Sequence, residues 1–230
     1  MSGWDLFKSE RYSEAAAEFS AELRISPSTL AFNNCGMANL HLGNYEAALS
    51  DFRSADQLSS IELSTVPDGA MSGVALWMAG DKHAALATWL AGVNAAGAGK
   101  VRYGDAAGGV TIGNLLVFAS AQLNNNDTKQ VATRYLRKRL RTKQATAWPG
   151  PISNYLVGKL SEPELLKLVS DVPTLREREM CQAHFYIGVE ALSCGRRNAY
   201  TFEIDQAVAF GRATKLGAEY YLALHENGIR

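Results

Sequence analysis

The sequence repeats one pattern of aromatic and small residues at an offset of 33 positions. Residues 12–19 (YSEAAAEF) align with residues 45–52 (YEAALSDF), so that Tyr, Ala and Phe fall at matching places. Apolar residues in both segments follow helical spacing. A period of roughly 20 to 50 residues is typical of solenoids, in which each unit buries its apolar face against its neighbours. The repeat therefore predicts stacked helical hairpins.

The second copy has the clearest set of structural residues. Gly36 and Ala48 would let two antiparallel helices approach closely, Gly43 would allow the turn between them, and Phe52 would fill the space between hairpins. A looser third copy, displaced by 37 residues, keeps the same internal spacing with Gly73, Gly80, Ala85, Trp89 and Gly92. An edited first copy contains Gly3, and an edited last copy begins at residues 183–188 (AHFYIG).

These residues resemble the tetratricopeptide repeat family, whose period is about 34 residues. A narrower resemblance extends from residue 30 to residue 226 and is carried by YLVGKLSEPEL (155–165), QAHFYIGVEAL (182–192) and EYYLALHE (219–226). This succession is similar to the bacterial tetratricopeptide lipoprotein of the new-lipoprotein-I type. The resemblance implies a homodimeric envelope adaptor that docks peptidoglycan hydrolases. Because the sequence shows no signal segment and no lipid-attachment Cys near its start, we expect a cytoplasmic relative with another partner.

The expected fold is an all-α, tetratricopeptide-like helical-hairpin solenoid of about 11–13 helices. We expect one continuous unit with hairpins over 1–100, an irregular helical insertion over 101–172, and a last hairpin with a terminal helix over 173–230. The composition, 47% apolar and 20% charged residues, suits packed helices. Within the insertion, residues 110–124 predict a buried helix, Asp127 the N-cap of the next helix, and Ser161 the cap of a later one.

In a tetratricopeptide array the first helix of each hairpin lines a concave groove, and this analogy defines the candidate binding residues. The set is apolar and adaptable, which favours an amphipathic helix or an extended apolar segment as ligand. Trp77 and Met78 have an alternative interpretation as core residues. The candidates are Asn33, Met37, Leu40 and His41 from one hairpin and Val74, Trp77 and Met78 from the next.

A basic helix is expected over residues 128–143. Residues 71–160 carry eleven Lys and Arg against three Asp and Glu. Clustered cations on one helix can neutralise phosphates, so nucleic-acid binding is one alternative. A net charge of zero and the lack of a known nucleic-acid motif instead favour a solvated or protein-docking face. The candidate basic patch is Arg134, Arg137, Lys138 and Arg141.

Catalytic motifs are weak. Cys181 and His184 stand three residues apart on an expected helix and could act as nucleophile and base, but a buried thiol beside an imidazole is the simpler interpretation. The segment around Gly97 and Lys100 fails the phosphate-loop pattern.

No stretch is apolar and long enough to span a membrane, and the three Cys suggest reduced thiols.

The residues therefore predict a non-enzymatic adaptor or scaffold without cofactor or metal. Its partner is expected to be a protein or peptide, and a homodimer is possible within that interpretation. The alternatives are an immunity or antitoxin-like protein that neutralises a cognate toxin, an enzyme that uses Cys181 and His184, and a nucleic-acid binder that uses residues 134–143.

Overall fold

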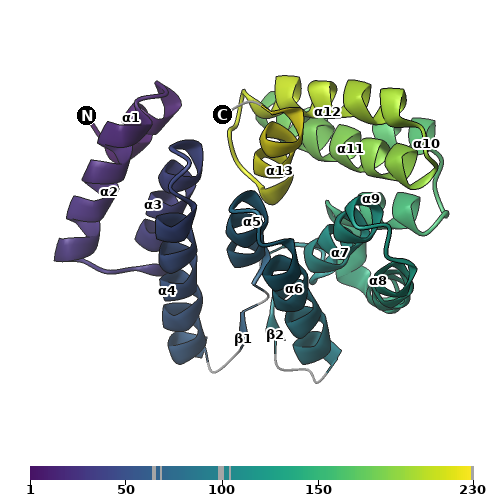
Figure 1. Cartoon of the computed structure of the whole chain (residues 1–230), viewed down its shortest axis with the longest axis horizontal. Helices are drawn as coiled ribbons and strands as arrows, with labels where there is room; N and C mark the ends of the chain where they lie inside the picture. Colours follow the sequence, from purple (N-terminus) through teal and green to yellow (C-terminus); the bar gives the residue numbers. More distant parts are fainter. Residues whose placement is uncertain (64–65, 68, 98–100, 104, 229–230) are drawn as a thin grey trace. The chain divides into compact units, whose positions relative to one another are not determined.

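The computed structural model describes residues 1–63, 66, 67, 69–97, 101–103 and 105–228. Within these residues the chain forms thirteen α-helices, one short 3-10 helix and two strands of two residues each (Figure 1). Consecutive helices pack as antiparallel pairs. This confirms the predicted all-helical class and the hairpin arrangement. The chain divides into two compact units, residues 1–102 and the residues from Tyr103 onward.

The first unit contains three hairpins. Its elements are α1 (Gly3–Lys8), α2 (Tyr12–Ile25), α3 (Thr29–His41), α4 (Tyr45–Leu63), β1 (Val66–Pro67), α5 (Ala70–Met78), α6 (Lys82–Gly97) and β2 (Val101–Arg102). The two strands pair in parallel, with Val66 opposite Val101. The repeat pattern did not predict this pairing, which links the segment after α4 to the segment after α6.

The second unit contains the remaining helices. They are α7 (Val110–Gln122), α8 (Asn126–Arg139), η1 (Lys143–Thr146), α9 (Gly150–Leu156), α10 (Glu162–Lys167), α11 (Pro173–Ser193), α12 (Arg197–Gly211) and α13 (Ala218–Asn227). Helices α11 and α12 form its most extensive pair, and α13 packs against both. As predicted, α7 is mostly buried, and Ser161 caps α10 in a reciprocal box with Glu164.

Each hairpin of the first unit closes with a glycine against an aromatic ring. The glycine lies on the first helix, and the ring follows it by 16 residues on the second. A Cβ atom on Gly36 would stand 2.7 Å from the Phe52 ring, and one on Gly73 would stand 2.1 Å from Nε1 of Trp89. Gly3 meets Phe19 in the same way. Only glycine permits such an approach, so the pattern read from the sequence has a direct steric basis.

One turn motif ends every odd-numbered helix from α1 to α11. In α3 the N–H of Asn44 donates to the carbonyl of Asn39, and the N–H of Gly43 donates to that of Leu40. This is the Schellman arrangement, which places one residue in the left-handed conformation and satisfies the last carbonyls of the helix. The equivalent left-handed residues are Glu10, Gly43, Gly80, Asn124, Gly158 and Gly195.

Candidate binding surfaces

The predicted groove residues of α3 are partly covered by the first hairpin. Leu40 is buried, with 2% of its surface exposed, whereas Asn33, Met37 and His41 are half-buried. Met37 packs against the apolar cluster formed by α1, α2 and α3. The ring of His41 stacks on Tyr12, with ring centroids 4.0 Å apart. The second half of α3 therefore faces the preceding hairpin rather than solvent.

The predicted groove residues of α5 belong to the core. Val74 and Trp77 are fully buried and Met78 is 8% exposed. Trp77 stacks on Trp89 of α6, with ring centroids 5.8 Å apart, and Nζ of Lys82 lies 5.1 Å from the Trp77 ring. These contacts hold the α5–α6 hairpin together. Burial favours the alternative interpretation of Trp77 and Met78 as core residues.

The start of α3 is the open part of the same stripe. Leu30, Asn33 and Met37 follow one another at positions i, i+3 and i+7, so they lie along one face of the helix. Leu30 is 65% exposed, and Ile25, just before the α2–α3 connection, is 86% exposed. Ser28 fixes this corner because its side chain accepts a hydrogen bond from the N–H of Ala31. The groove analogy did not single out Ile25 or Leu30.

Helix α8 is anchored along one face only. Its N-cap is Asn125, whose side chain accepts from the N–H of Thr128, so the prediction of Asp127 as the cap is wrong. Asp127 lies in the first turn instead, where its charge favours the helix dipole. The inner face packs against α7, and the Tyr135 hydroxyl donates to the carbonyl of Gly109 at 2.7 Å. The opposite face is left to solvent.

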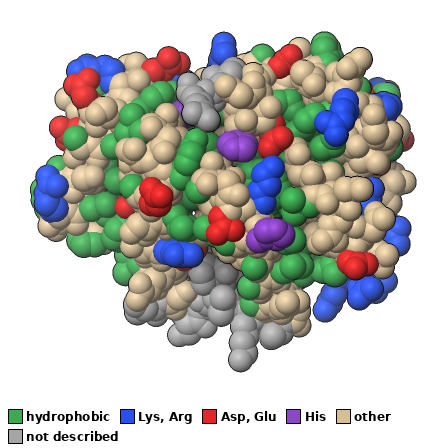
Figure 2. All heavy atoms as spheres, viewed as in Figure 1, with side chains coloured by type: hydrophobic (Ala, Val, Ile, Leu, Met, Phe, Trp, Pro, Cys, Tyr) green, Lys and Arg blue, Asp and Glu red, His purple; other side chains and the backbone are tan. Residues whose placement is uncertain are grey.

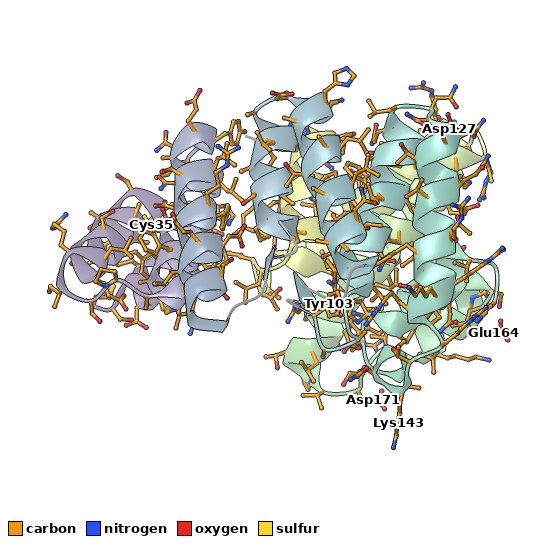
Figure 3. The ribbon with its side chains drawn as sticks, turned by 90° about the horizontal axis from the view of Figure 1, so that it is seen from below. Cys35, Tyr103, Asp127, Lys143, Glu164 and Asp171 are labelled. Carbon is orange, nitrogen blue, oxygen red and sulfur yellow. The ribbon has the colours of Figure 1, made fainter. Side chains whose placement is uncertain are left out.

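The outer face of α8 and the turn that follows it carry the predicted basic patch. Arg134, Arg137, Lys138 and Arg141 are all exposed. Figure 2 shows Lys and Arg side chains gathered at the lower right, where Figure 1 places α8. In Figure 3, side chains tipped with nitrogen project from this helix between Asp127 and Lys143. These side chains border an open groove of about 740 Å³, lined by Asn126, Lys129, Gln130, Thr133, Arg134, Arg137, Lys138 and Arg141.

The charges of this face are not compensated by ion pairs within the part of the chain that the structure describes. Residues 126–143 hold seven Lys and Arg against the single acid Asp127. Among the described residues, no ion pair involves any of the four patch cations. Neighbouring like charges at i, i+3 and i, i+4 each cost a helix about 0.2–0.5 kcal/mol. Arg139, on the inner side, instead places its guanidinium 4.5 Å from the Tyr103 ring centroid.

Among the described residues, no hydrogen bond joins Cys181 to His184. The Cys181 thiol is 2% exposed, and burial, with a smaller contribution from Glu219, raises its pKa far above the usual range for a thiol. A catalytic thiol needs the opposite shift. Nδ1 of His184 lies 2.7 Å from Oε2 of Glu203, and its ring stacks on Phe210. The imidazole is therefore held by two side chains of α12.

A polar cluster that the sequence did not indicate joins three helices of the second unit. The side-chain amide of Gln122 donates to the Tyr200 hydroxyl at 2.6 Å and to the Glu226 carboxylate at 2.7 Å. The Tyr200 hydroxyl in turn donates to the same carboxylate. Burial and the nearby carboxylate raise the pKa of Tyr200, which keeps it a donor. The cluster is a tie between α7, α12 and α13, and no short motif could have revealed it.

The chain matches no protein-family model. No curated protein is significantly similar to it either. Among the described residues, no helix is long and apolar enough to cross a bilayer, and no three His, Cys, Asp or Glu side chains gather as a metal-binding group. Gly97 is the last residue of α6, and the rest of the glycine-rich segment with Lys100, residues 98–100, lies outside the described residues.

Proposed function

We propose that this protein is a scaffold of the tetratricopeptide type that binds a partner protein at the start of α3. Three hairpins with the same glycine–aromatic closure and the same turn support a repeat array in residues 1–97. The observation that carries the binding role is the exposed apolar corner of Ile25 and Leu30 at the open end of the α3 stripe. Both side chains flank the short α2–α3 connection, and exposed apolar surface can mark an interaction site.

The chemistry of this corner suits an apolar or amphipathic segment. Fully burying a Leu or Ile side chain contributes about 1.5–3 kcal/mol, so Ile25 and Leu30 can act as anchors. Asn33, one turn further along α3, can donate and accept hydrogen bonds to the partner's backbone or side chains. No charged side chain occurs on α3 between Thr29 and Leu40, so a ligand chosen by charge is not expected here.

The test compares two matched double variants as affinity baits in the native host. Ile25→Ser with Leu30→Ser removes the proposed anchors, and Leu168→Ser with Val172→Ser removes two exposed apolar side chains of the second unit. We expect a reproducible partner that the wild type and the second variant retain and that the first variant loses by about 10-fold or more.

Calorimetry with the purified partner should show the same order of affinity. A partner lost only from the Leu168 and Val172 variant would place binding elsewhere and overturn the assignment to α3. Equal recovery with all three baits would do the same.

A further inference from the structure

We propose that the outer face of α8 binds the phosphate backbone of a double-stranded nucleic acid. This role is additional to the protein-binding role proposed above, because it uses another helix, another unit of the chain and another kind of chemistry. It starts from a line of side chains. Gln130, Arg134 and Arg137 recur at i, i+4 and i+7 and therefore run along one edge of the helix, and Arg141 lies in the turn directly after its C-cap.

The first argument is electrostatic. The four patch cations are exposed and make no ion pair among the described residues, so they are available to an external anion. Arg and Lys neutralise backbone phosphates and release condensed counterions, which drives binding without reading sequence. The lone acid of the segment, Asp127, which Figure 3 labels at one end of α8, precedes Arg137 by 10 residues and Arg141 by 14.

The second argument is the composition of the groove. Its lining consists of cationic, amide and hydroxyl side chains, with no aromatic and no aliphatic residue. Protein interfaces concentrate aromatic and apolar residues at their centre, and single-stranded nucleic acids are held by stacking on aromatic rings. A helix that lies in a membrane surface needs an exposed apolar side. None of the large exposed apolar side chains of the described residues lies on α8, so a duplex backbone is the polyanion that this face fits.

The third argument is size. A helix with its side chains is about 10–12 Å across, close to the width of about 12 Å of the major groove of B-form DNA. Helix α8 has 14 residues and packs mainly against α7, so its free side can approach a groove or a backbone without moving another helix. Asn126, Gln130 and Thr133 flank the Arg line and can donate to phosphate oxygens.

The test is fluorescence anisotropy with a labelled, mixed-sequence DNA duplex of about 20 base pairs. We expect the full chain to bind with a logarithmic salt slope of about −3.6 if four phosphates are neutralised, which is a loss of about 150-fold between 50 and 200 mM KCl. The variant Arg134→Gln/Arg137→Gln/Arg141→Gln should bind at least about 10-fold more weakly and with a slope near −0.9.

A second variant separates this face from charge in general. Lys159→Gln/Lys167→Gln/Arg176→Gln removes the same charge from exposed sites elsewhere in the same unit and should bind like the wild type. Circular dichroism verifies that both variants fold. Equal weakening by both variants, salt-independent binding, or no binding at low salt would overturn the proposal. Stronger binding to the single strand or to vesicles of phosphatidylglycerol would overturn the choice of a duplex.

Discussion

Glu10 has a backbone conformation that usually requires glycine. Its φ is 62°, in the left-handed region, and the equivalent residue of the next two hairpins is Gly43 or Gly80. A side chain in this region costs about 1–2 kcal/mol because Cβ crowds the backbone. The first hairpin therefore carries local strain that the second and third avoid.

Replacing Glu10 by Gly should stabilise the protein. We expect Glu10→Gly to raise the free energy of unfolding by about 0.5–1 kcal/mol, since the relief of strain is partly offset by the greater freedom of glycine in the unfolded chain. Gly43→Ala should lower it by about 1 kcal/mol for the converse reason. Urea denaturation measures both values. A loss of stability in Glu10→Gly would contradict the steric argument.

At the scale of residues, the sequence predicted the packing contacts that depend on short, fixed spacings. The closures of Gly36 on Phe52 and Gly73 on Trp89 follow from small and large residues at fixed offsets. The same spacings could not show which of the groove candidates face solvent. Whether Trp77 faces solvent or Trp89 depends on how neighbouring helices rotate about their axes, which a spacing of 3.6 residues per turn does not determine.

Helix α8 shows a conflict between the stability of an element and its proposed use. Arg134 has Arg137 at i+3 and Lys138 at i+4, and no acid among the described residues forms an ion pair with any of the three. The segment nonetheless forms a helix because Thr128, Ala132, Tyr135 and Leu136 are buried on its inner side. Packing therefore outweighs the surface charge.

Reversing the charge of Arg134 should make α8 more stable but less able to bind the proposed nucleic acid. In Arg134→Glu, two repulsive pairs become attractive, with a gain of about 1 kcal/mol at low ionic strength. The gain should nearly disappear in 1 M NaCl, where the screening length is about 3 Å. Thermal unfolding at both salt concentrations checks this, and a gain that persists at high salt would show that charge is not its cause.

The same variant should also weaken duplex binding, because the side chain lies in the centre of the proposed face. The amphipathic pattern of residues 128–143 predicted this helix and its basic side, but its predicted end is wrong, because α8 stops at Arg139 and Lys143 begins the 3-10 helix η1. The pattern failed at the cap, because Asn125 and Asp127 are both good capping residues and only the backbone decides between them.

At the scale of the molecule, each of the two compact units has its own contacts. Gly73 and Trp89 close a hairpin of the first unit, whereas Gln122 and Glu226 tie helices of the second. Compact units with separate cores can open separately. Damage to one core should therefore remain within its unit.

We expect Gly73→Ala to loosen the first unit alone. The added Cβ would meet the Trp89 indole, whose Nε1 donates to the carbonyl of Ala70 at 3.1 Å, and overpacking of this kind costs about 1–3 kcal/mol. Native-state hydrogen exchange should show faster exchange in α5 and α6 and unchanged protection in α11 and α12. Uniform loss of protection across the chain would indicate a single cooperative unit instead.

The sequence predicted the hairpins of the first unit better than the packing of the second. Repeats place contacts at fixed short offsets, so a period is sufficient to find them. The hydrogen bond from Trp148 to Gln182 spans 34 residues, and that from Gln122 to Glu226 spans 104. Such contacts depend on the path of the whole chain, and neither composition nor helical periodicity encodes them locally.

The turns within the hairpins have a constant length, and this affects how such a chain can evolve. The connections Ser9–Arg11, Leu42–Asn44, Ala79–Asp81 and Cys194–Arg196 are each three residues long. The stretches between hairpins vary, from three residues at 26–28 to ten at 140–149 and twelve between the end of α6 and the start of α7. A hairpin can thus be exchanged as a single unit. Recombination at Ser26–Ser28 would transfer a hairpin together with its glycine–aromatic contact and its turn. The neighbouring hairpins would then have to supply only a new contact face.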